Sequence, residues 1–186
     1  MSELDGLRRR SAKAWAWFHE TVEDVDEPIA RWRPPGTANS IGVTYFHVIV
    51  NVDVEINRLV LDRPPLIEGP QWDGDAGQGF AYDPDRFDRW VRGAKVDWTR
   101  LRSYGIAVGA ALLAALDQID EGALSMPIDM TRAGLGMWSG QRLLDLHGWE
   151  HLYIHGGEIA ALKGMQGGVG WPGEPDEFRA AVQVEE

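Results

Sequence analysis

The stretch HGWEHLYIH, residues 147–155, places three of the chain's five histidines at a spacing of four residues. On a helix, side chains at i and i+4 lie about 5–6 Å apart at Cβ, so two neighbouring imidazoles can reach one metal ion at about 2.0–2.1 Å. His147 and His155 are about 12 Å apart along a helix axis and cannot both bind that ion. One i,i+4 pair can therefore serve a given metal, and another segment must supply the third ligand.

The three histidines fall on the helix face that we expect to be buried. A single stripe contains Leu144, His147, His151, Ile154, His155, Ile159 and Leu162. Burying an imidazole without a partner costs about 1–3 kcal/mol, so several such residues in one place need an explanation. A metal ion is one explanation, and core histidines satisfied by hydrogen bonds are another.

The two remaining histidines differ in their surroundings. His47 lies within the apolar run IGVTYFHVIV and needs a partner if that run is buried. His19 is followed by Glu20 and lies close to Glu23, so we expect it to be solvated. His47 is accordingly the better candidate for a ligand from another segment.

Two helices are predicted in the first third of the chain. Apolar residues recur every three or four positions over residues 3–24, which predicts an amphipathic helix. A Pro/Gly/Asn loop follows, and Asn39 or Ser40 can cap a second helix over residues 41–61. The first half of that helix is apolar nearly all round, which is typical of a deeply buried helix.

A long connection separates these helices from two more. Residues 62–83 are rich in Gly, Pro and Asp, and loops of this length are often functional. We expect this connection, with Trp72, to close part of a pocket at the metal. A short helix near residues 84–91 and a third long helix, capped by Asp97 and running to Ile119, should follow.

The last part of the chain is predicted to hold the fourth long helix. Residues 120–138 are expected to form a loop, after which Ser139 caps a helix that ends near Lys163, with Gly164 as terminator. A Gly-rich, acidic tail follows. No strand is predicted. We therefore expect an all-α, single domain over residues 1–186, with a core at about 3–165 and a long crossover between the second and third helices of a four-helix bundle.

Composition narrows the function classes. The net charge of −11 disfavours nucleic acid as a partner. The sequence contains no run of about 18 uncharged apolar residues, so we expect no membrane span. Cysteine is absent, which excludes disulfides, thiolate ligands and a cysteine nucleophile. A small-molecule substrate and a cytoplasmic location are the simplest expectations, and a homodimer is left open.

Three segments together carry a resemblance to a known family. HLYIHGGEIAALKGMQG resembles the last-helix signature of the DinB/YfiT-like family, RWRPPGTANSIGVTYFHV resembles its loop into the second helix, and VDWTRLRSYGIAVGAALLAALDQI is similar to its third helix. The likeness covers about residues 5–168. It implies a four-helix bundle with a long crossover and a divalent metal, zinc or nickel foremost, held by three histidines.

Carried over by motif position, the implied metal ligands are His47, His151 and His155, and His147 lies outside the triad. Glu158 stands where many members have Gln, and it either orients His151 or His155 or is an ordinary polar residue near the helix end. No catalytic residue is evident, and Asn51 and Glu158 are the candidates for a general base near the metal.

The resemblance also suggests a reaction. Several members are transferases or isomerases that use a low-molecular-weight thiol such as bacillithiol, mycothiol or glutathione, and three neutral ligands leave a metal able to favour the thiolate. We therefore expect a metal-dependent enzyme that transfers such a thiol. A metal-dependent hydrolase and a non-catalytic metal- or ligand-binding bundle are the alternatives.

Two further metal patterns can be compared with the sequence. His147-Gly-Trp-Glu150-His151 fits the H-x-x-E-H pattern, in which the Glu is a general base, but that site needs a carboxylate ligand further downstream. A ferritin-like di-iron site needs Glu-x-x-His twice, and the sequence contains none.

Overall fold

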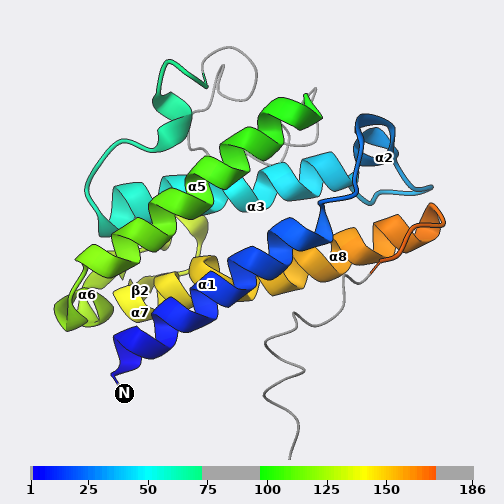
Figure 1. The fold of residues 1–186 in the computed structure, drawn as a ribbon. Helices are drawn as coiled ribbons and strands as arrows, with labels where there is room; N and C mark the ends of the chain where they lie inside the picture. The colour runs from blue at the N-terminus through cyan, green and yellow to red at the C-terminus, as the bar shows by residue number, and fades with distance from the viewer. Residues whose placement is uncertain (1, 73–96, 171–186) are drawn as a thin grey trace, which may run out of the picture.

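The computed structural model describes residues 2–72 and 97–170, and its long helices lie along one another (Figure 1). These are α1 (Glu3–Thr21), α3 (Ile41–Glu55), α5 (Trp98–Gln118) and α8 (His151–Met165). Both α1 and α3 pack against α5 and α8, so α1 and α3 stand at opposite corners of the bundle. The predicted all-α four-helix bundle is confirmed.

Shorter elements extend and connect the long helices. They are α2 (Glu27–Arg31), the π-helix η1 (Ile56–Val60), the 3-10 helices η2 (Leu66–Glu68) and η3 (Thr131–Ala133), α6 (Glu121–Ser125), β1 (Pro127–Asp129), β2 (Met137–Ser139), α7 (Gly140–Asp145) and the π-helix η4 (Leu146–Glu150). The crossover leads from η1 through η2 to α5. The short helix predicted near residues 84–91 and the acidic tail lie outside the described residues.

The predicted caps set the starts of three helices. The side chain of Ser40 accepts a hydrogen bond from the Val43 amide at the start of α3. In the same way, Asp97 accepts from the Arg100 amide at the start of α5, and Ser139 accepts from the Arg142 amide at the start of α7. Each cap satisfies an amide of the first helical turn that has no partner within the helix. The cap was predicted correctly in each case, with Ser40 rather than Asn39 at the second helix.

The segment expected to be a loop, residues 120–138, contains α6 and a small antiparallel hairpin instead. Strands β1 and β2 pair with Ile128 opposite Trp138, and the turn between them uses positive φ at Gly134 and Gly136. Ile128 and Met130 are buried against α7. Strands of three residues are too short to display a period-two pattern, so the prediction without strands was wrong here.

The fourth helix is interrupted by a π-turn, which changes its buried face. Across η4 the helix takes up an extra residue per turn, so the stripe that begins at Leu144 does not continue to Ile154, which is 58% exposed. The predicted place of Ile154 in the buried stripe was therefore wrong. The helix also continues past Gly164 to Met165, and the left-handed residue after it is Gly167.

The start of the crossover is held by a buried carboxylate on α3. Asp53 accepts hydrogen bonds from the Tyr104 hydroxyl at 2.6 Å, the Asn57 amide at 2.7 Å and the backbone amides of Leu66 and Ile67, both at 2.8 Å. Burial raises the pKa of Asp53, and these donors act in the opposite direction. The network joins α3, α5 and η2 at one point.

A glycine lets α1 approach α8 closely beside the histidines. A Cβ built on Gly156 would lie 2.1 Å from Cζ3 of Trp17, whereas a Cβ on the neighbouring Gly157 would meet no atom within 4 Å. The first glycine of the HGGE stretch therefore has a packing role, and the second has none in the described residues.

These two glycines make a matched pair of substitutions. Gly156→Ala should lower the free energy of unfolding by about 1–3 kcal/mol, because the added methyl overpacks the contact with Trp17. Gly157→Ala should raise it by up to about 1 kcal/mol through helix propensity alone. Urea denaturation of both variants checks this, and equal effects of the two would contradict the packing argument.

Candidate metal centre

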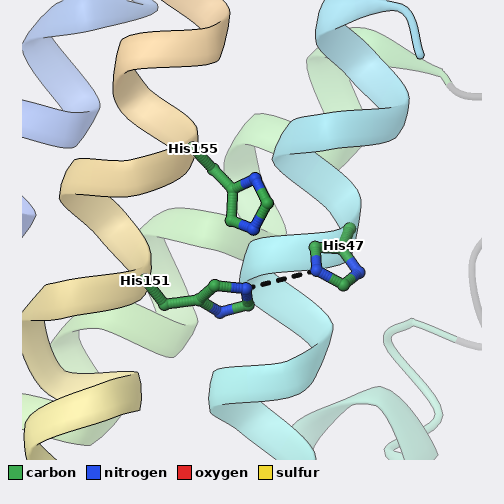
Figure 2. A group of neighbouring side chains, drawn as sticks. All are labelled: His47, His151 and His155. Atoms are coloured by element: carbon green, nitrogen blue, oxygen red, sulfur yellow. Dashed lines mark hydrogen bonds between the residues drawn. The ribbon is translucent and has the colours of Figure 1, made fainter. Parts of the chain in front are cut away.

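Three histidines from two facing helices point toward one another. His47 comes from α3, and His151 and His155 come from successive turns of α8, as Figure 2 shows. One ring nitrogen from each lies within 4.8 Å of the others, and the ring centroids are 4.4–5.0 Å apart. The structure thus brings together the three residues that the resemblance implied.

The spacing of the nitrogens is compatible with one metal ion. His47 Nε2 and His151 Nε2 are 3.2 Å apart. Two nitrogens each about 2.1 Å from a tetrahedral ion lie about 3.4 Å apart, so this pair is already near the ligand separation. A modest adjustment of the His155 ring would complete a three-nitrogen set with at least one coordination position left over.

Burial holds His151 in the form that a metal ligand needs. Desolvation, followed by the neighbouring His147, His155 and His47, lowers the pKa of His151 to about 2. The ring is therefore neutral across the ordinary pH range, with a nitrogen lone pair available. An imidazolium at this position would face both burial and three nearby rings.

Two of the three rings have a polar neighbour that fixes their orientation. His155 Nδ1 lies 2.7 Å from Glu158 Oε2, which is an acceptor for an Nδ1–H. Asn51, one turn after His47, places its side-chain amide 3.3 Å from His47 Nδ1. The contact with Glu158 leaves Nε2 of His155 for a metal. The Asn51 amide nitrogen is a donor and also lies 3.5 Å from His47 Nε2, so a metal at that Nε2 would require Asn51 to present its amide oxygen to Nδ1–H instead. Of the two interpretations of Glu158 that the sequence allowed, the contact favours the one in which it orients His155.

His147 continues the line of histidines but has a different partner. Its Nε2 lies 2.5 Å from Oε2 of Glu55 at the end of α3, and the two side chains are only 5% and 8% exposed. The ring stands edge-on to His151 with centroids 5.4 Å apart. A buried glutamate beside the histidines was missed from the sequence, although its position eight residues after His47 puts it on the same face of α3.

The H-x-x-E-H reading does not agree with these contacts. Glu150, its presumed general base, forms an ion pair with Arg142 at 2.7 Å. The carboxylate that approaches His147 is Glu55. In the described part of the chain, the residues that come close enough to share an ion are three histidines, without a carboxylate.

The prediction that His19 is solvated was wrong. Its ring stacks obliquely on Trp15 with centroids 5.2 Å apart, and Nδ1 lies 3.4 Å from the Tyr45 hydroxyl. Burial, with a smaller contribution from Arg102, lowers the pKa of His19 to about 4. His19 lies on α1, outside the three-histidine cluster, and packs against the aromatic rings of Trp15 and Tyr45.

A cavity of about 230 Å³ opens at the Glu55 end of the histidine line. Its lining comes from the end of α3, from η1 and from the hairpin region: Val54, Glu55, Arg58, Leu59, Asp129, Met130 and Ala133. The predicted pocket wall was the 62–83 connection with Trp72. Trp72 packs against Tyr104 of α5 instead, and residues 73–83 lie outside the described residues.

Comparisons with known proteins agree with this fold. The model of the DinB superfamily matches residues 11–159. The fold is similar to a solved structure described as the crystal structure of the conserved protein of locus from Enterococcus faecalis. The superposition covers 88% of this chain and 96% of that chain, with a TM-score of 0.67 and 20% sequence identity. No curated protein matches the chain. In the described residues, no helix has the length and apolar character needed to cross a bilayer.

Proposed function

Because the chain belongs to the DinB superfamily, we propose that His47, His151 and His155 bind one divalent metal ion and that the protein is a metal-dependent enzyme acting on a small molecule. The observation that carries the proposal is the convergence of three imidazole nitrogens within 4.8 Å in a partly buried position. Zinc and nickel are the proposed metals, since imidazole suits both.

The ligand set favours catalysis over a structural role. Structural zinc sites are closed by four protein ligands, whereas catalytic sites use three and keep a position open. Three neutral imidazoles also leave the ion's charge uncompensated. The scaffold does not depend on the ion for its core, because the helices bury a continuous apolar cluster of their own.

We propose a transferase that uses a low-molecular-weight thiol. A bound divalent cation lowers the pKa of a thiol and favours the nucleophilic thiolate. The chain has no cysteine, so the sulfur must come from a small molecule. The protein's part is to hold the rings of His47 and His155 through Asn51 and Glu158, to exclude water with the apolar faces of α3 and α8, and to leave room for a small electrophile.

Metal loading distinguishes the ligands from their neighbours. His47→Ala should abolish tight binding of zinc or nickel, because it removes the ligand supplied by α3. His147→Ala should still bind one equivalent, because its ring lies outside the triad. Metal content after dialysis, with circular dichroism to verify folding, makes the comparison. Equal loading of the His47 variant and the unaltered protein would refute the triad.

The reaction is tested with a panel of thiols and electrophiles. Metal-loaded protein should catalyse the formation of a conjugate between the added electrophile and bacillithiol, mycothiol or glutathione, and metal-free protein should not. Mass spectrometry detects the conjugate. Hydrolysis of esters or amides without conjugate would favour the hydrolase. An absence of any turnover by the loaded protein would favour a binding bundle.

A further inference from the structure

Three buried ring nitrogens meet at one place without hydrogen bonds of acceptable geometry in the described part of the chain. They are Nδ1 and Nε2 of His147 and Nδ1 of His151. A buried polar atom without a partner costs about 1–3 kcal/mol in protein interiors, so such atoms are rarely clustered by chance. They belong to two adjacent rings whose centroids are 5.4 Å apart.

The chemistry of the two rings allows one consistent assignment. Glu55 is a carboxylate neighbour 2.5 Å from His147 Nε2, and a carboxylate is an acceptor, so a proton belongs on that nitrogen. A neutral imidazole carries one proton, which makes His147 Nδ1 an acceptor. His151 faces His47 through Nε2, so its own Nδ1 carries the proton and is a donor.

We propose that Glu55 and His147 are positioning residues for the metal ligand His151. The Glu55 carboxylate accepts from His147 Nε2–H, and His147 Nδ1 accepts from His151 Nδ1–H, which directs His151 Nε2 to the ion. The inference rests on the proposed metal site. It gives His151 what Glu158 gives His155, an acceptor for Nδ1–H that fixes the ring and raises its basicity.

The π-turn η4 places His147 where this chain of contacts requires it. In an uninterrupted α-helix, each step of four residues turns the side chain by about 40° relative to the last. η4 (Leu146–Glu150) contains His147 and ends directly before His151, so the step between these two side chains departs from that of a regular α-helix. In this arrangement His147 lies beside Glu55, and its ring is 5.4 Å from that of His151.

The decisive variant is the double substitution Glu55→Leu with His147→Phe. It replaces a buried polar pair by apolar groups of similar volume, a change that protein interiors often tolerate, and it leaves the three ligands intact. We expect the zinc dissociation constant, measured by competition with a chelator, to rise by about 10–100-fold. The single variant Glu55→Gln should give a smaller rise.

The matched control is Asp53→Asn. It removes another buried carboxylate of α3, one that contacts Tyr104 and the crossover rather than the histidines. Its stability should fall while its zinc affinity stays unchanged. If the control loses zinc affinity as the double variant does, the effect is a general loosening of α3, and the positioning role is wrong.

A spectroscopic readout is independent of folding in the variants. In zinc-loaded protein labelled with ¹⁵N-histidine, long-range ¹H–¹⁵N spectra should show His147 protonated at Nε2 and His151 protonated at Nδ1. A proton on His147 Nδ1, or an affinity unchanged in the double variant, would overturn this inference alone. Failure of the unaltered protein to bind zinc or nickel would overturn the proposed function, and this inference with it.

Discussion

The interface between α3 and α8 contains imidazole rings where a helical bundle ordinarily holds aliphatic side chains. The rings of His47, His151 and His155 lie 4.4–5.0 Å apart, and none can be accommodated there without compensation for lost solvation. Asn51 and Glu158 supply part of it through contacts with His47 and His155, and a shared cation would supply the rest. The fold must keep the two helices at a fixed separation for both kinds of contact to persist.

That separation is set by contacts outside the cluster. On one side, Gly156 lets Trp17 of α1 approach the backbone of α8 beside the last two histidines. On the other, Asp53 ties α3 to Tyr104 of α5 and to the beginning of the crossover. Lys163, buried near the end of α8, donates to the Thr21 carbonyl of α1. Both partner helices are thus anchored to rigid neighbours, so the imidazoles are held in position before any ligand arrives.

The helices were predictable because their signals are local. Helical periodicity, the caps Ser40, Asp97 and Ser139, and the apolar run after Ile41 each act within a few residues, and each appears in the structure. The hairpin was not predictable in the same way, since its short strands are stabilised by burial of Ile128 against α7. The π-turn is likewise a tertiary outcome that a regular period of 3.6 cannot anticipate.

The candidate site also has features that the sequence shows and features that depend on tertiary contacts. The i,i+4 spacing of His151 and His155 is visible in the sequence, and the apolar run around His47 marked it as the candidate ligand from another segment, a choice that the family resemblance made definite. The environment of each ring could not be foreseen. His19 is packed on Trp15 despite its acidic neighbours, and Glu55 meets His147 because two helix faces coincide in space. Contacts between distant segments are the information that the pattern along one chain does not contain.

X-ray absorption spectroscopy of the zinc-loaded protein would identify the groups that bind the ion. We expect one ion with three imidazole nitrogens at about 2.0–2.1 Å and an additional exchangeable light-atom ligand. The imidazole signal should fall by one third in His155→Ala loaded at saturating zinc. An ion with fewer than two imidazoles, or a coordination shell unchanged by removal of His155, would contradict this expectation.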